Sequence, residues 1–300
     1  MRGSMNRTHM PLAVLLAVLL LLSGCIQPLP EELPTPIESS SESVADTEPA
    51  RPVYLYQTMT YQYKTDVTAS VSYFATELDA DYLLLANKST PLGSDYVPKE
   101  LTTLTCPTSS NKQISLEMRT AQALYAMLNE MRADGVTEIY VTSGYRPYDY
   151  QHQLYRNYLN KEKSTITQEA YACLGAEYIQ ATYLSKGLDR LTEEDAIKVV
   201  LSYSALPGTS EHQSGLCVDF VDVHAGALTE AFENTEAFRW LSENAYRFGF
   251  ILRYPVHKTA VTGYTYEPWH YRFVGREAAT EIYFRDLTLE EFLTDLFKTS

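Results

Sequence analysis

The sequence predicts an α+β fold, in which flanking helices pack on a central antiparallel sheet in one domain. Helix-like and strand-like segments are mixed along the 300 residues without the regular strand–helix–strand period of a doubly wound sheet. Hydrophobic residues make up 45% of the chain and charged residues 21%, an ordinary balance for a globular protein. A chain of this length can bury a sizeable hydrophobic core without needing disulfides or structural metal ions for stability.

Charge and composition exclude several classes of protein. Lys and Arg number 24 against 38 Asp and Glu, so the net charge is -14 and no nucleic-acid partner is expected. No apolar run reaches the roughly 18 residues that a membrane-spanning helix needs. Four Cys are too few for a disulfide scaffold, although Cys106 and Cys173 could pair.

Residues 1–24 are predicted to be a lipoprotein signal peptide. Two Arg precede an apolar run at residues 12–22, which is too short to span a bilayer but suits a signal-peptide core. The run ends in Leu-Ser-Gly-Cys25, which resembles a bacterial lipoprotein box, so Cys25 is the expected lipidation site. The mature protein would be anchored to the cell membrane by lipid, extracytoplasmic and facing the cell wall. The alternative is an ordinary secretory signal with a chance Cys.

Residues 25–52 are predicted to be a disordered tether that starts at the lipidated Cys. They contain six Pro, a Ser cluster and six acidic residues before the first basic residue, Arg51. Such a segment buries too little apolar surface to fold. We expect it to hold the following domain away from the membrane.

The remaining elements follow from periodicity. Alternating Tyr, Thr and Val predict strands in an N-terminal extension at residues 53–81, and residues 82–300 form the main domain. Further strands are expected at residues 82–85, 139–141, 216–223, 250–253 and 264–274, the last interrupted by Pro268. Helices are expected at residues 116–134 and 147–158, in pieces within 161–200, at 238–248, and after a capping box at 288–291.

Two histidines and one aspartate carry the chemistry that the residue pattern predicts. His212 precedes the strand at residues 216–223, in which Asp219 lies among apolar neighbours and needs a partner for its charge. The nearby Asp222 competes for that role. His270 lies on a later strand. Two imidazoles and one carboxylate suit a catalytic zinc that keeps an open position for water.

Glu267 is the candidate for taking a proton from that water. In a regular strand, residues three apart point to opposite faces, so Glu267 reaches the site of His270 only from an irregular junction at Pro268. Taken alone, Glu267 reads as a solvated strand residue, and His212 as a surface or core histidine.

Three blocks carry a resemblance to a known family. They are Ser-Gly-Tyr-Arg-Pro at 143–147 with Gln151, Pro-Gly-Thr-Ser-Glu-His-Gln-Ser-Gly-Leu-Cys-Val-Asp at 207–219, and Gly-Tyr-Thr-Tyr-Glu-Pro-Trp-His-Tyr-Arg at 263–272. In this order they resemble the VanY-type D-alanyl-D-alanine carboxypeptidases, of the zinc peptidase group that also includes LdcB-type L,D-carboxypeptidases and VanX-type dipeptidases. The resemblance extends from about residue 82 to the end of the chain.

The resemblance implies a role for each matched residue. One zinc ion per chain would be bound by His212, Asp219 and His270. Glu267 would be the general base and acid, and Arg146 would polarise the scissile carbonyl and hold the oxyanion. Substrate-binding residues would be Gln151, Ser210, Trp269 and Tyr145. For Arg146 the plainer alternative is a salt bridge at a helix start.

Two features depart from the family pattern. The segment 161–200 is longer than expected between the first two blocks and is expected to form a lid or wall of the cleft. Cys217 stands where the family often has Ala, two residues before Asp219. A thiolate ligand is one interpretation of Cys217, and a small buried thiol is the default.

The resulting expectation is a zinc carboxypeptidase that removes the terminal D-Ala from peptidoglycan stem peptides. The closest alternative is an L,D-carboxypeptidase acting on tetrapeptide stems; a D,D-dipeptidase fits the exposed location less well. An alternative of another class is a non-catalytic, zinc-bearing cell-wall-binding module. Such a module would be expected to lack Glu267 or Arg146, and both are present.

Overall fold

The computed structural model describes residues 54–75, 78–223 and 227–298. The predicted signal peptide at residues 1–24, the lipidation site Cys25 and the tether at residues 25–52 lie outside these ranges. None of the helices in these ranges is long and apolar enough to cross a membrane.

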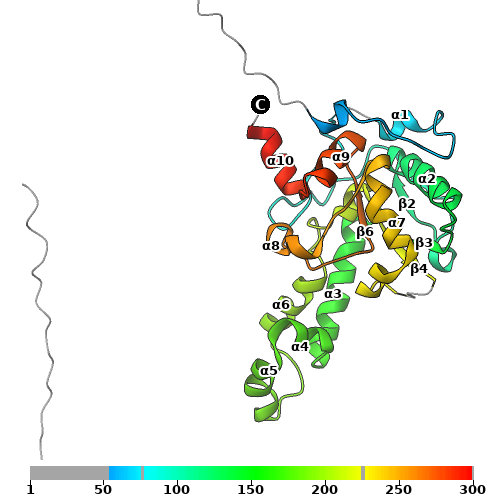
Figure 1. Cartoon of the computed structure of the whole chain (residues 1–300). Coiled ribbons are helices and arrows are strands. Elements are labelled where there is room, and N and C mark those ends of the chain that lie inside the picture. Colours follow the sequence, from blue (N-terminus) through cyan, green and yellow to red (C-terminus); the bar gives the residue numbers. More distant parts are fainter. Residues whose placement is uncertain (1–53, 76–77, 224–226, 299–300) are drawn as a thin grey trace, which may run out of the picture. The chain divides into compact units, whose positions relative to one another are not determined.

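A four-stranded antiparallel sheet with strand order β3-β4-β6-β5 forms the centre of the domain (Figure 1). Its strands are β3 (Ile139–Ser143), β4 (Cys217–Asp222), β5 (Phe250–Leu252) and β6 (His270–Phe273). A second, two-stranded antiparallel sheet pairs β1 (Leu101–Thr103) with β2 (Ser115–Glu117). The predicted α+β fold with a central antiparallel sheet is confirmed.

The two faces of the central sheet differ in chemistry. Asp219 on β4 pairs with His270 on β6, and the neighbouring pair Val218 and Tyr271 points to the opposite face, because successive side chains alternate along a strand. Val218, Phe220, Tyr271 and Phe273 all belong to the main hydrophobic core. One face therefore buries apolar side chains, and the other presents Asp219 and His270.

Helices cover the apolar face. The main core combines sheet residues with the buried sides of α2 (Met118–Ala133) and α7 (Glu236–Asn244). A second core lies on the opposite face of the sheet, between α9 (Arg276–Phe284), α10 (Leu289–Lys298) and residues that include Ile251 of β5, which pairs with Arg272 and so points to the same side as His270. The expected capping box starts α10: the Glu291 amide donates to Thr288 Oγ1 at 3.1 Å, and the Thr288 amide donates to Glu291 Oε2 at 2.8 Å.

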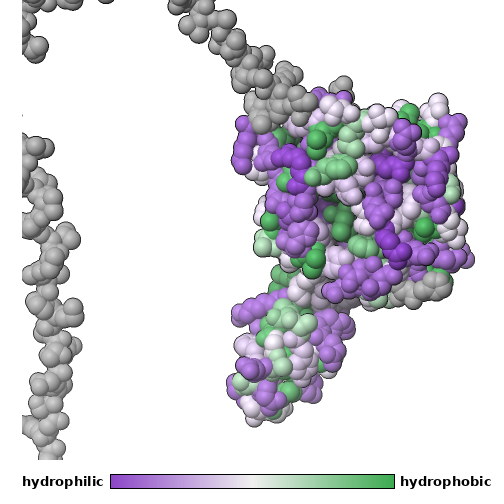
Figure 2. Space-filling view, in the orientation of Figure 1, coloured by the Kyte–Doolittle hydropathy of each residue, from purple (hydrophilic) through white to green (hydrophobic). Residues whose placement is uncertain are grey.

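The segment 161–200 is helical in pieces, as expected, and extends an arm from the domain (Figure 1). The arm consists of the end of α3 (Tyr148–Ser164), α4 (Gln168–Leu174), α5 (Ala176–Thr182) and α6 (Glu193–Tyr203). It has its own small core, which includes Ile179, Tyr183 and Val199. Polar side chains cover much of the outer surface of the arm in Figure 2. The short helices α1 (Val71–Phe74) and α8 (Thr259–Thr262) complete the described α-helices.

Two strand predictions near the N-terminus are wrong. Residues 54–75 contain a 3-10 helix at Leu55–Gln57 and α1, and no strand. Their side chains do alternate between exposed and half-buried, because the extended chain packs on helices: Tyr61 hydrogen-bonds to Thr280 of α9 at 2.8 Å, and the Lys64 amide donates to Glu130 of α2 at 2.7 Å. The alternation of exposed and half-buried side chains in this segment thus reflects packing on helices rather than pairing with another strand.

Residues 82–85 are buried or half-buried but also form no strand. The guanidinium of Arg272 donates from Nη2 to the carbonyls of Tyr82 and Leu84 at 3.0 and 2.6 Å. A side chain therefore satisfies backbone acceptors that a strand partner would otherwise take. The expected strand at 264–274 is likewise shorter than predicted, since β6 begins only at His270.

The cysteines of the described residues are all free. Cys106 is half-buried beside the main core, Cys173 is exposed on α4, and Cys217 is buried on β4. The suggested pairing of Cys106 with Cys173 is therefore not present.

Candidate active site

Strand register brings Asp219 and His270 together. The two residues are cross-strand partners, and Asp219 Oδ1 lies 3.0 Å from His270 Nδ1. Both side chains are almost fully buried. Asp222 pairs with Ile139 and, three positions further along β4, lies on the other face of the strand. Of the two competing aspartates, Asp219 is the one beside the imidazoles.

A tight turn before β4 delivers His212 to the same place. His212 lies in a 3-10 helix, Glu211–Ser214, which ends at Gly215 with φ of 70°, a left-handed conformation that favours glycine. His212 Nδ1 lies 2.7 Å from the carbonyl oxygen of Gly144, to which it donates. The other ring nitrogen, Nε2, then faces Asp219 Oδ2 at 3.2 Å.

The end of β3 closes this arrangement. Val141 pairs with Phe220, and a bulge between Val141 and Ser143 shifts the register by one residue. Ser143 therefore pairs with Asp219, which a regular strand would pair with the residue before Ser143. A Cβ atom at Gly144 would lie 2.6 Å from the carbonyl oxygen of Ser115, so only glycine fits at the position that holds the His212 ring.

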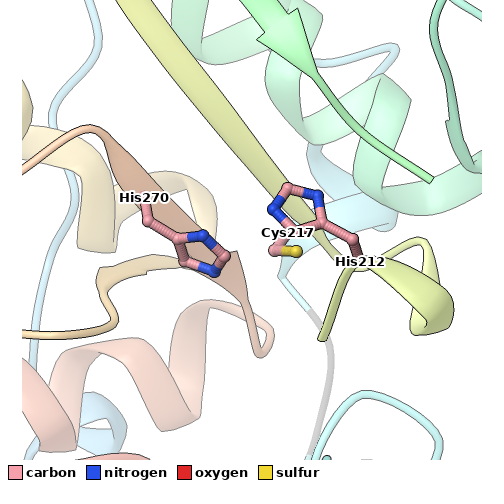
Figure 3. Close-up of side chains that lie close together, drawn as sticks. All are labelled: His212, Cys217 and His270. Atoms are coloured by element: carbon pink, nitrogen blue, oxygen red, sulfur yellow. The ribbon is translucent and has the colours of Figure 1, made fainter. Parts of the chain in front are cut away.

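Figure 3 shows His212 and His270 with Cys217 between them, at the N-terminal end of β4. Ligand atoms of these three residues lie within 4.8 Å of one another. Burial raises the pKa of the Cys217 thiol, but the two neighbouring imidazoles outweigh it and lower that pKa to about 7. The structure therefore offers two candidates for a third donor, Asp219 and Cys217.

The donor set fits a zinc ion. Asp219 Oδ1 is buried without a hydrogen bond in the described part of the chain; its contact with His270 is close but lacks hydrogen-bond geometry. Burial and the charge of Arg146 oppose protonation of His212, yet Asp219 raises the pKa of His212 to about 9. The carboxylate that favours a positive charge on His212 is suited in the same way to a bound cation, which histidine and carboxylate donors hold in their deprotonated forms.

Glu267 reaches the site from an irregular turn. The His270 amide donates to the carbonyl of Glu267 at 3.1 Å, which closes a turn through Pro268 just before β6. Glu267 Oε2 lies 3.6 Å from His270 Nδ1. Burial raises the pKa of Glu267 to about 7, with the positive His270 opposing and the negative Asp219 reinforcing the shift. Such a carboxyl group can both accept and donate a proton near neutral pH.

Arg146 is fixed beside the imidazoles by its neighbours. Its backbone amide donates to the carbonyl of His212 at 2.9 Å, and Nη1 donates to Gln151 Oε1 at 3.0 Å. Gln151 is buried and donates through Nε2 to the carbonyl of Ala205 at 2.8 Å. Both ends of the Gln151 amide are thus engaged within the protein, which indicates that Gln151 orients Arg146.

A cleft of about 530 Å³ contains these groups. Ser210 and Trp269 line it, whereas Tyr145 is not among its lining residues. The Tyr145 amide donates to the carbonyl of Ser115 at 2.7 Å. The sequence missed the far wall, which is formed by Tyr150, Leu154 and Tyr158 of α3 with Tyr203 of α6. The spacing of four residues between Tyr150, Leu154 and Tyr158 on one helix was the available signal.

The comparisons with known proteins agree with this geometry. The family model described as VanY, D-alanyl-D-alanine carboxypeptidase, matches residues 113–276. A D-alanyl-D-alanine carboxypeptidase of Enterococcus faecalis is 38% identical over 211 residues, which cover 70% of this chain. The chain spans 65% of the length of that relative, just under two thirds.

Three solved structures share the fold. A VanY D,D-pentapeptidase from a VanB-type vancomycin-resistance cassette, in complex with Zn(II), is 36% identical with a TM-score of 0.53, covering 71% of this chain and 99% of its own. VanYB in complex with D-alanine-D-alanine has the same identity and TM-score, covering 71% and 97%. The LdcB LD-carboxypeptidase is 33% identical with a TM-score of 0.56, covering 71% and 86%.

The chain belongs to the VanY D-alanyl-D-alanine carboxypeptidase family, as its three sequence blocks predicted. One of these relatives was solved with Zn(II), and this chain has a cluster that could hold a metal ion, in which ligand atoms of His212, Cys217 and His270 lie within 4.8 Å of one another.

Proposed function

We propose that this protein is a zinc-dependent D-alanyl-D-alanine carboxypeptidase that removes the terminal D-Ala from peptidoglycan stem peptides. The observation that carries the proposal is the position of Glu267: its carboxyl group lies 3.6 Å from His270 Nδ1, in the cleft that also holds His212 and Asp219. A proton-transfer group beside a metal-binding cluster is the arrangement that metal-assisted hydrolysis requires.

His212, Asp219 and His270 would hold the zinc ion, as the resemblance implies. Bound in such a site, zinc supplies Lewis acidity and lowers the pKa of a water molecule to about 7. The proposed role of Glu267 is to accept the proton of the attacking water and to pass it to the leaving amine of D-Ala. Its raised pKa of about 7 suits both halves of that transfer.

Arg146 would bind the oxygen on which negative charge develops during hydrolysis. Its Nε is buried without a hydrogen bond among the described residues, while Nη1 is held by Gln151. A fixed donor aimed into the cleft stabilises developing charge without having to reorganise, and one such donor contributes roughly 3 kcal/mol. Ser210 and Trp269 would contact the substrate from the same cleft.

The alternative of an L,D-carboxypeptidase is supported by the likeness to LdcB, whose TM-score of 0.56 is similar to the 0.53 of the VanY structures. The two activities release the same residue and differ in the stereochemistry of the residue before the scissile bond. We favour the D,D activity because residues 113–276 match the VanY family model.

The deciding experiment compares kcat/KM on synthetic pentapeptide and tetrapeptide stems, with products identified by mass spectrometry. We expect the pentapeptide to be preferred and amidation of its terminal carboxylate to abolish cleavage, because a site that hydrogen-bonds a substrate group rejects analogues lacking it by up to about 10⁴-fold. A clear preference for the tetrapeptide would replace the D,D assignment with L,D and leave the zinc chemistry intact. Cleavage of neither stem by the zinc-loaded protein would favour the non-catalytic wall-binding module.

We also propose that the protein is a lipoprotein anchored outside the cell membrane through Cys25. The support is the sequence of residues 1–25, in which a short apolar run ends in Leu-Ser-Gly-Cys. An extracytoplasmic location would give the cleft access to peptidoglycan stems.

A further inference from the structure

A buried charge cluster lies beside His270. Its centre is Glu211, the residue before His212, whose side chain has no exposed surface. Glu211 Oε1 accepts two hydrogen bonds, one from Arg253 Nε and one from Arg272 Nη1, both at 2.8 Å. Sequence reasoning assigned no role to any of these three residues.

The remaining donors of both arginines are occupied elsewhere. Arg253 donates from Nη1 and Nη2 to the two carboxylate oxygens of Glu290 on α10, at 2.9 and 2.7 Å. Arg272 donates to three backbone carbonyls. Two arginines and two glutamates thus balance in charge, but buried ion pairs of this kind add little net stability over apolar residues of similar size. The cluster therefore calls for an explanation other than stability.

That explanation lies at the second oxygen of Glu211. Oε2 has no hydrogen-bond partner among the described residues, and the same holds for His270 Nε2; both atoms are buried. They lie 3.6 Å apart. The other ring nitrogen of His270, Nδ1, is turned the opposite way, toward Asp219 and Glu267.

We infer that Glu211 is a positioning residue for His270. A histidine that binds metal through one nitrogen carries its proton on the other, and a carboxylate that accepts this proton sets both the tautomer and the ring orientation. Glu211 is suited to that task because the two arginines hold its first oxygen and so aim the second at Nε2. His270 then presents Nδ1, without its proton, to the cleft.

The inference rests on the proposed role of His270 as a zinc ligand, and the experiment separates the two. Zinc affinity is measured by competition with a chelator for wild type, Glu211→Gln, Glu290→Gln and His270→Ala, with melting temperatures recorded in parallel. Glu290→Gln is the matched control, because it removes a carboxylate from the same cluster without touching His270. Loss of a carboxylate that orients a metal-binding histidine typically weakens metal binding 10- to 100-fold.

We expect Glu211→Gln to bind zinc at least about tenfold more weakly, and Glu290→Gln to lower the melting temperature while keeping wild-type affinity. Equal zinc affinities in these two variants would overturn the positioning role. Full zinc retention by His270→Ala would instead overturn the assignment of His270 as a zinc ligand, on which the positioning role of Glu211 rests.

A second measurement uses only wild-type protein and therefore does not depend on whether a variant folds. In zinc-loaded wild-type protein labelled with ¹⁵N-histidine, long-range ¹H–¹⁵N spectra report which nitrogen of His270 binds metal and which keeps its proton. We expect metal at Nδ1 and a proton at Nε2. Metal at Nε2 would place that atom away from Glu211 and refute the inference directly.

Discussion

Each imidazole of the site commits one nitrogen to the protein and leaves the other for the cleft. His212 uses Nδ1 for the carbonyl of Gly144, at 2.7 Å, and His270 turns Nε2 toward Glu211. The two rings lie edge to face with centroids 5.0 Å apart. Two acceptor groups, the carbonyl of Gly144 and the carboxylate of Glu211, therefore decide which lone pairs of the imidazoles face a metal ion.

Substitution of the two candidate third donors distinguishes them. Asp219→Ala is expected to lose stoichiometric zinc, because a three-ligand site rarely survives with two, whereas Cys217→Ala is expected to keep it. Zinc content of the purified, folded variants by elemental analysis is the measurement. The reverse pattern, with zinc lost only from Cys217→Ala, would make the thiolate the third ligand.

Removal of the proton-transfer group should separate chemistry from metal binding. Glu267→Gln is expected to keep zinc and the wild-type fold but to lose at least about 100-fold in kcat, because an amide cannot accept the proton of water. Turnover of a pentapeptide stem and zinc content are measured on the same preparation. Near-normal turnover would exclude Glu267 as the base.

At the scale of elements, one buried carboxylate attaches the N-terminal extension to the domain. Glu130 on α2 accepts hydrogen bonds from the backbone amides of Lys64 and Thr65, at 2.7 and 2.9 Å, and from Arg247 at 3.3 Å. Burial opposes ionisation, but these donors together lower the pKa of Glu130 below its ordinary value of 4.5. The extended chain is held here by a side chain rather than by a neighbouring strand.

Glu130→Gln is expected to lower the free energy of unfolding by about 2 kcal/mol at pH 7, since the lost hydrogen bonds are made to a charged group. Because the pKa of Glu130 is lower in the folded state, its contribution is present above pH 4.5 and is lost as the pH falls through the folded-state pKa. Urea titrations at several pH values should therefore show the variant and the wild type converging in acid. Glu177→Gln, at an exposed position of α5, is the control that should change little.

The arm extends the wall of the cleft. Tyr158 of α3 lines the cleft and packs edge to face on Tyr203 of α6, with ring centroids 5.4 Å apart. Tyr203 is in turn held by the buried Glu162, whose Oε1 accepts from the tyrosine hydroxyl at 3.0 Å. This part of the wall is thus aromatic, and Tyr158 and Tyr203 hold each other through a ring contact and the hydrogen bond to Glu162.

If this wall contacts the stem peptide, Tyr158→Ala should lower kcat/KM for a pentapeptide stem about tenfold, which corresponds to about 1.4 kcal/mol of lost aromatic contact. Cleavage of N-acylated D-Ala-D-Ala, which keeps the scissile bond but lacks the distal residues of the stem, should be affected less. Tyr155→Ala on the same helix is the matched control, because Tyr155 does not line the cleft. Equal losses on both substrates would point to a structural role for Tyr158.

At the scale of the whole molecule, the N-terminal sequence predicts where the protein is located. Wild-type protein expressed with its signal is expected to partition with membranes and to carry a lipid mass at Cys25, and Cys25→Ser is expected to lack that lipid. Mass spectrometry of the mature N-terminus and membrane fractionation are the measurements. Soluble release of unlipidated wild-type protein would favour the ordinary secretory signal.

The sequence by itself determined the family, the fold class and the group of residues that meet in the cleft. His212, Asp219, Glu267, Arg146 and Gln151 were found because the three sequence blocks that contain them resemble those of the VanY family. Predictions from local periodicity failed at residues 54–73 and 82–85, although the alternating pattern of the first segment and the apolar character of the second were real. There the partners of the backbone were side chains far along the chain, Glu130 and Arg272, rather than strands.

Only the tertiary structure decided between alternatives that local pattern treats as equal. Asp219 and Asp222 are both acids on β4, and the register of β4 with β6 and β3 sets one beside His270 and the other opposite Ile139. Glu211 is a charged residue in a loop by its sequence, yet it is the acceptor shared by arginines from 42 and 61 residues away. Such contacts depend on which strands pair and in which register, and this is settled only when the whole sheet closes around its core.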